Sequence, residues 1–153
     1  MKRLLIFQLL FTLHASPVFA WGSASMGGGA GLTCSWGSNV VVNGTFTGNA
    51  NNWTLGAGWA YTANTVQSTG DGTLSQTVSV SASQIWRISY DIPTYLAGTV
   101  TVSIGGTNGT ARSSSGTHTE DITASGAGNL IFTPAVGANF TLDNVTARLW
   151  TCE

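Results

Sequence analysis

Charged residues are scarce in this sequence. Lys and Arg together number 5 and Asp and Glu 6 among 153 residues, so charged side chains make up 7% of the chain, against roughly 25% in an average soluble domain. A protein that binds nucleic acid needs clustered Lys and Arg to contact the phosphates. Because the sequence has no such cluster and a net charge of −1, it excludes nucleic-acid binding.

The chain also has no apolar run long enough to cross a membrane. Its apolar stretch at residues 4–13 holds about ten residues, whereas a spanning helix needs roughly 20. The basic start Met1-Lys2-Arg3 and the small-residue end Val18-Phe19-Ala20 are typical of a secretory signal peptide. We therefore expect residues 1–20 to be removed near Ala20 and the protein to be secreted, extracellular or periplasmic, without membrane insertion.

Lysine is absent after Ala20. The remaining chain carries three arginines and six acidic residues, so its net charge is −3 with His118 neutral. Long-range electrostatic attraction to anionic membranes or acidic polymers is therefore not expected.

Cysteine occurs only twice, at Cys34 and Cys152. In an exported chain an even pair of this kind predicts one disulfide. It would close a loop of more than 100 residues and stabilise the fold by on the order of 4 to 5 kcal/mol in the chain-entropy model. A redox pair needs closer spacing, and a metal site needs more ligands.

No stretch shows a sustained helical period of 3.6 residues, so we expect almost no helix. Residues 21–31 form a small-residue stretch that predicts a flexible leader, and residues 32–153 are the expected folded domain. Its short β-prone runs lie at residues 74–80, 85–92, 99–104, 118–124, 129–133 and 140–150, with turns at 69–72, 105–109 and 125–128. Short strands separated by Gly-rich turns predict an all-β antiparallel sandwich.

The clearest strand is residues 85–92, in which apolar and polar side chains alternate. Alternation of this kind places one set in the core and the other on the outside. The predicted core set is Trp86, Ile88, Tyr90 and Ile92, and the polar set includes Arg87, Ser89 and Asp91.

Catalytic groups are also few. Glycoside hydrolysis needs two carboxyl groups across the scissile bond, and the acidic residues form no evident pair, since Glu120 and Asp121 are expected on opposite faces of one strand. After Ala20 the only histidine is His118, and no Gly-x-Ser-x-Gly motif is present, so neither a zinc site nor a serine nucleophile is indicated. We therefore predict that the protein is not an enzyme.

Several motifs occur in a characteristic order between residues 39 and 149. They are Asn43-Gly44-Thr45-Phe46, Trp53, Gly58-Trp59, Leu74-Ser75-Gln76-Thr77-Val78, Trp86-Arg87-Ile88-Ser89-Tyr90 and Phe140-Thr141-Leu142-Asp143-Asn144-Val145. In this order the chain resembles the galactose-binding-like β-sandwich jelly roll of the carbohydrate-binding modules of cellulases and xylanases, which also occurs in phage and bacterial surface proteins.

The resemblance implies that Phe46, Trp53 and Trp59 are core residues. It also implies a structural calcium ion near the termini, with Asp143 as a ligand. However, Thr47 stands where the family usually has an acidic side chain, and calcium requires six to eight oxygen ligands with charge among them. The Cys34–Cys152 disulfide is the alternative means of tying the two ends together.

A sugar is recognised by an aromatic plane for its C–H face and by planar polar side chains for its hydroxyls. On the predicted sheet, Arg87 and Asp91 share a polar face, Tyr95 follows in the next loop and Arg112 lies in a later connection. These four residues are the predicted carbohydrate-binding cluster. The alternative is that Arg87 and Asp91 form a surface ion pair and that Tyr95 covers the sheet edge.

We therefore predict an exported, non-catalytic carbohydrate-binding module whose partner is a polysaccharide or glycan. The alternative from a different class is a structural or adhesion surface protein, such as a filament subunit, in which the sandwich edges mediate self-association. Nothing in the sequence decides whether Trp36 is buried.

Overall fold

The computed structural model describes residues 31–153. The predicted signal peptide, residues 1–20, and all but the last residue of the predicted leader, residues 21–31, lie outside the described residues. Leu32–Glu153 fold into one compact unit. Within it, no helix has the length and apolar character that crossing a bilayer requires.

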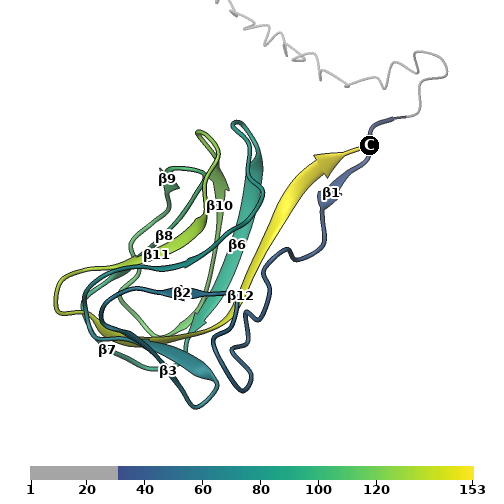
Figure 1. The fold of residues 1–153 in the computed structure, drawn as a ribbon. Helices are drawn as coiled ribbons and strands as arrows, with labels where there is room; N and C mark the ends of the chain where they lie inside the picture. The colour runs from purple at the N-terminus through teal and green to yellow at the C-terminus, as the bar shows by residue number, and fades with distance from the viewer. Residues whose placement is uncertain (1–30) are drawn as a thin grey trace, which may run out of the picture. The chain divides into compact units, whose positions relative to one another are not determined.

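The described part of the chain is built from strands alone (Figure 1). They are β1 (Cys34–Trp36), β2 (Thr54–Leu55), β3 (Trp59–Thr62), β4 (Thr65–Ser68), β5 (Leu74–Gln76), β6 (Ile85–Ile92), β7 (Tyr95–Ala97), β8 (Val100–Ile104), β9 (Thr107–Asn108), β10 (Gly116–Thr123), β11 (Leu130–Pro134) and β12 (Asn139–Cys152).

These strands form two sheets. One has seven strands in the order β10-β6-β12-β4-β3, with β1 and β7 also paired to β12, and the other has five in the order β2-β5-β11-β8-β9. Every strand pair is antiparallel. The two sheets face each other as layers (Figure 1). The predicted all-β antiparallel sandwich is confirmed.

The core lies between the sheets and follows the alternation in the strands. In β6 the side chains of Ile88, Tyr90 and Ile92 are completely buried. The Tyr90 ring meets Phe132 of β11 edge-on, with ring centroids 5.1 Å apart, so this contact joins the two sheets. Full burial of such aromatic and branched side chains supplies the main stabilising term of the fold.

The aromatic residues of the first three motifs are also in the core. Phe46 is completely buried, and Trp53 and Trp59 are each 7% exposed. The Trp53 ring lies 5.3 Å from the Phe46 ring, and its indole N–H donates to the carbonyl oxygen of Asn43 at 3.1 Å. The Trp59 ring packs edge-on against Phe140. The prediction that Phe46, Trp53 and Trp59 are core residues is confirmed.

Gly44 connects the first motif to the last. The amide of Val145 in β12 donates to the Gly44 carbonyl oxygen at 2.9 Å. A β-carbon at position 44 would collide with the carbonyl of Val145, so this close approach of two backbones requires glycine.

The predicted strand at residues 74–80 is shorter in the structure, because β5 ends at Gln76, whose register partner Leu130 begins β11. Beyond that point the backbone leaves the sheet, although Val78 and Val80 remain buried. The Gln76 side chain makes two 2.8 Å hydrogen bonds with the backbone of Val42, accepting from its N–H and donating to its carbonyl oxygen. These bonds satisfy the backbone N–H and carbonyl groups of Val42, which belongs to no strand.

The two cysteines form the predicted disulfide. Cys34 of β1 and Cys152 of β12 are register partners with Cα atoms 4.0 Å apart, and their sulfurs are bonded. The bond joins positions separated by 118 residues and holds the short strand β1 against the end of β12.

Candidate functional site

The outer face of the seven-stranded sheet carries rows of polar side chains. The register of β10, β6 and β12 places Asp121 opposite Arg87, and Arg87 opposite Arg148. In the next row Thr119 lies opposite Ser89, and Ser89 opposite Thr146. These rows are on the outside because their β6 members alternate with the buried residues of the same strand.

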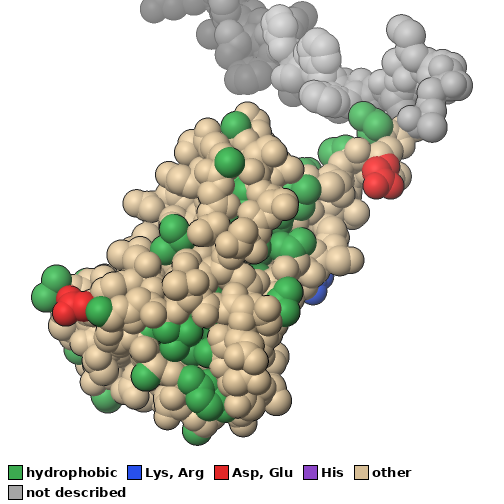
Figure 2. Space-filling view, viewed as in Figure 1, with side chains coloured by type: hydrophobic (Ala, Val, Ile, Leu, Met, Phe, Trp, Pro, Cys, Tyr) green, Lys and Arg blue, Asp and Glu red, His purple; other side chains and the backbone are tan. Residues whose placement is uncertain are grey.

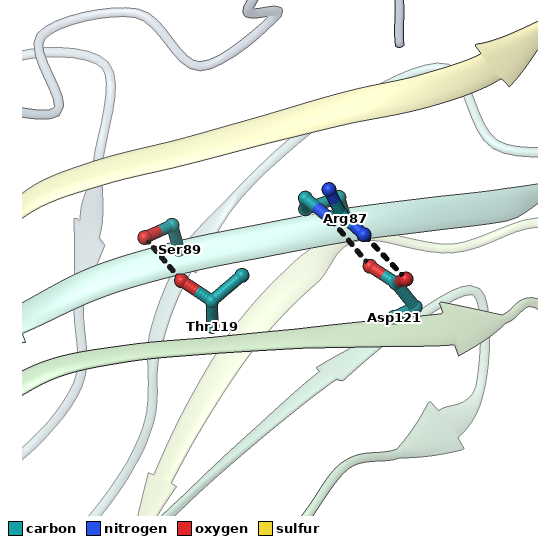
Figure 3. A network of polar contacts seen from close by, with 4 residues as sticks. All are labelled: Arg87, Ser89, Thr119 and Asp121. Carbon is teal, nitrogen blue, oxygen red and sulfur yellow. Dashed lines mark hydrogen bonds and ion pairs between the residues drawn. The ribbon is translucent and has the colours of Figure 1, made fainter. Parts of the chain in front are cut away.

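Arg87 and Asp121 form a two-pronged ion pair (Figure 3). Arg87 Nε donates to one carboxylate oxygen and Nη2 to the other, each at 2.8 Å. Such parallel bonds fix the plane of both groups. The bonds hold the pKa of Asp121 below its usual range and raise the pKa of Arg87. Both side chains remain about two-fifths exposed, at 41% and 43%, so they are accessible to a ligand.

A pair of tryptophans borders this polar face. Trp36 of β1 and Trp150 of β12 are register partners, and their rings lie 4.9 Å apart at a tilt of 55°. The Arg87 guanidinium stacks 4.2 Å from the centre of the Trp36 ring. Trp150 is 36% exposed. The guanidinium is therefore held between an aromatic ring and a carboxylate, which leaves it little freedom to move.

Two adjoining hollows run along this face, and we call them together the outer-sheet groove. The first has a volume of about 290 Å³ and is lined by Trp36, Ile85, Arg87, Asp121 and Trp150. The second has a volume of about 330 Å³ and is lined by Trp36, Arg87, Ser89, Thr119, Thr146 and Arg148. Trp36 and Arg87 border both hollows. The groove thus offers aromatic surface at one end and hydroxyl and guanidinium donors at the other.

Of the four predicted binding residues, Arg87 lines the groove and Asp91 lies four residues further along β6, on the same face. The carboxylate of Asp91 accepts hydrogen bonds from the Thr117 hydroxyl at 2.6 Å and from the Asn144 amide at 2.7 Å. The alternative prediction of an Arg87–Asp91 ion pair is wrong, because the cross-strand register gives Arg87 the nearer partner Asp121.

Tyr95 and Arg112 lie elsewhere. Tyr95 is half-buried against the core and its hydroxyl donates to the Gly98 carbonyl oxygen at 2.8 Å. Arg112 flanks the five-stranded sheet through backbone bonds to Val100, and its charge acts on the hydroxyl of Tyr90, which points inward. The structure therefore brings Arg87 and Asp91 onto one face but does not gather all four residues into one cluster.

A separate set of buried polar atoms belongs to Tyr90, Arg112 and Glu120. The Tyr90 hydroxyl is buried with no hydrogen-bond partner among the described residues, as are Arg112 Nε and Glu120 Oε1. Burial, followed by the charge of Glu120, raises the pKa of Tyr90 to about 12, and Arg112 opposes this shift. The other Glu120 oxygen accepts from the Thr110 amide at 2.7 Å. Because Tyr90 is completely buried, its hydroxyl is not available to a polymer outside.

Asp143, the predicted calcium ligand, is the register partner of Asp91. Burial and then the charge of Asp91 raise the pKa of Asp143, while a bond from the Asn144 amide opposes the rise. The hydroxyls of Thr47 and Thr45 form a hydrogen bond with each other at 3.0 Å. Residues 31–153 hold no group of three His, Cys, Asp or Glu side chains placed for a metal. Two carboxylates fall short of the donor set that calcium prefers, and calcium binding at Asp143 stays a prediction.

The sequence pattern did not predict Trp36, Trp150, Asp121 or Arg148 as site residues. A signal for the tryptophans was present in the predicted disulfide, because Trp36 follows Cys34 by two residues and Trp150 precedes Cys152 by two. If the strands at the two cysteines pair antiparallel and in register, these positions must be opposite each other.

No protein-family model matches the sequence, and no curated protein matches it. Among solved structures, the chain is similar to one described as "Mannan Binding Module from Man5C in bound conformation". The two are 20% identical, with a TM-score of 0.46, over 64% of this chain and 90% of that one.

Proposed function

We propose that the protein is an exported, non-catalytic carbohydrate-binding module of the galactose-binding-like type that binds a polysaccharide or glycan in the outer-sheet groove. The observation that carries the proposal is the tryptophan pair, Trp36 and Trp150, beside the fixed Arg87–Asp121 fork on an open sheet face.

This arrangement matches what a sugar presents. The C–H face of a pyranose packs on aromatic rings, while its hydroxyls need donors and acceptors in set directions. The Arg87 guanidinium and the hydroxyls of Ser89 and Thr119 are already oriented by partners within the protein. Donors held in place before binding lose little conformational entropy when the ligand arrives. The two hollows share Trp36 and Arg87, so neighbouring units of one chain could occupy them.

The groove chemistry supports binding without catalysis. Among the described residues, Asp121 is the one carboxylate that lines the groove, whereas glycoside hydrolysis requires a pair. The bonds from Arg87 keep the pKa of Asp121 low, so it is a poor proton donor at neutral pH.

Export is supported by the Cys34–Cys152 disulfide, because disulfides persist in oxidising compartments.

The test is a glycan and polysaccharide array on the protein with its disulfide formed, followed by calorimetric titration of the best ligand, with calcium and again with a chelator. The variant Trp36→Ala should weaken binding by about tenfold or more, because it removes the ring shared by both hollows. Thr133→Ala, on the exposed side of β11 in the other sheet, is the matched control and should bind normally. Absence of binding across the array, or normal binding by a folded Trp36→Ala variant, would count against this function and site.

A further inference from the structure

Two arginines lie directly opposite each other in the groove. Arg87 and Arg148 are register partners on β6 and β12, and like charges in such positions destabilise a sheet. Asp121 uses both its oxygens on Arg87, and no described residue forms an ion pair with Arg148. The second hollow therefore carries surplus positive charge, in a domain whose acidic residues outnumber its arginines six to three.

We propose that the Arg148 end of the groove binds an anionic group carried by a sugar, a carboxylate or a sulfate ester. This inference rests on the proposed glycan-binding function. A guanidinium presents parallel N–H donors that match the oxygens of either group. An anion placed there would also relieve the repulsion between Arg87 and Arg148.

The other residues of the second hollow point to a sugar rather than a bare anion. Ser89, Thr119 and Thr146 line it together with the ring of Trp36. The hydroxyls of Ser89 and Thr119 are bonded to each other at 2.9 Å (Figure 3), and each retains capacity for a further hydrogen bond. A hollow with hydroxyls, an aromatic edge and surplus positive charge complements a sugar acid more closely than it does an inorganic ion.

The charges further along the sheet limit the density of anions in the ligand. Asp91 and Asp143 are register partners on the same two strands, beyond the hydroxyl row, and would repel a second anionic group there. The net negative charge of the domain also opposes a dense polyanion. The expected ligand is therefore a glycan with isolated anionic units and neutral neighbours.

The test uses oligosaccharides in matched forms: neutral, bearing one uronic acid, and bearing one sulfate, on xylan, mannan, galactan and glucan backbones. Calorimetric titration at low salt should show one anionic form binding about tenfold more tightly than its neutral match. Comparing the uronic acid form with the sulfate form then identifies whether the anionic group is a carboxylate or a sulfate ester. Arg148→Gln should abolish this preference, so that the anionic form and its neutral match bind with equal affinity. Arg148→Lys should retain part of the preference, since the positive charge remains but the parallel N–H donors of the guanidinium are lost.

Thr133→Glu is the matched control, because it changes the net charge of the domain by the same amount on the exposed side of the other sheet. It should keep the preference. If neutral and anionic forms bind equally, or if Arg148→Gln keeps the preference, this inference is overturned and the proposed function stands. If no form binds on any backbone, the proposed function fails and the inference with it.

Discussion

At the residue scale, the groove depends on one guanidinium. Arg87 is held by stacking on Trp36 and by two bonds to Asp121. At an exposed site such contacts contribute little to stability, because solvent screens them. Their effect is mainly on position, because the two contacts together restrain both the orientation and the location of the guanidinium.

A second residue-scale feature, the Tyr90 hydroxyl, gives a prediction that depends on pH. Its pKa is raised to about 12 from an ordinary value near 10, so the folded state favours the protonated form. The stability gained is complete below about pH 10 and is lost as the pH rises towards 12, a change of about 2 to 3 kcal/mol. Chemical denaturation across this range measures it.

The matched variant is Tyr90→Phe, which removes the titrating group but keeps the ring that packs on Phe132. It should flatten the decline in stability between pH 10 and 12. Spectrophotometric titration of the folded protein should show one tyrosine ionising late, and that component should be missing in the variant. An equally steep decline in both proteins would mean that other groups cause the alkaline loss.

At the element scale, β12 organises the sheet. Its first residues pair with β4 and β7, its middle with β6, and its end with β1. The register shifts between Asp143 and Thr146, where Asn144 has a left-handed φ of 51°. Bulges of this kind bend a strand, and in Figure 1 β12 runs from the sandwich to its pairing with β1. The groove lies over this second half of β12.

The disulfide should therefore control binding as well as stability. The double variant Cys34→Ser/Cys152→Ser leaves β1, three residues long, with no covalent hold, so Trp36 loses its fixed place beside Trp150. We expect the free energy of unfolding to fall by on the order of 4 kcal/mol, and glycan affinity to fall with it under conditions where the variant is still folded. Chemical denaturation and calorimetric titration measure the two effects.

Reduction of the wild-type protein is the companion experiment and should reproduce the variant. Unchanged affinity in a folded, reduced protein would show that β1 is held by its backbone pairing alone. In that case the groove would not depend on the disulfide.

At the scale of the whole molecule, the surface distinguishes a binding module from an assembling subunit. Figure 2 shows a face made mostly of backbone and of side chains that are neither hydrophobic nor charged, with scattered hydrophobic side chains and few charged ones. Six of the described strands pair with one neighbour only, namely β1, β2, β3, β7, β9 and β10. Unpaired edges are the usual route to strand-to-strand assembly. Leu96 and Val136 are exposed apolar side chains, at 67% and 92%.

We expect a monomer, because the proposed glycan groove uses the sheet face and needs no second copy. Multi-angle light scattering over a wide concentration range, with the disulfide formed, should give a constant monomer mass. A mass that grows with concentration would favour the alternative, a structural or adhesion protein that self-associates through its edges. Adding the glycan found in the array then shows whether assembly and binding compete.

The sequence by itself determined the strand-rich fold, the core and the disulfide. Alternation in β6 and β8 identified their buried sides, since successive side chains of any strand point to opposite faces. Phe46, Trp53 and Trp59 were placed in the core through the resemblance of their motifs. Cys34 and Cys152 could be paired because there were no other cysteines to choose from.

Only the tertiary structure decided which polar side chains meet. Arg87 is bonded to Asp121, 34 residues further along the chain. Trp36 contacts Trp150 because β1 pairs with β12. Tyr95 and Arg112, which were predicted to join Arg87 and Asp91 in one cluster, do not line the groove. The physical reason is that a strand's own alternation sets its inner and outer faces, whereas its neighbours depend on sheet order and register, and these are settled by packing of the whole sandwich.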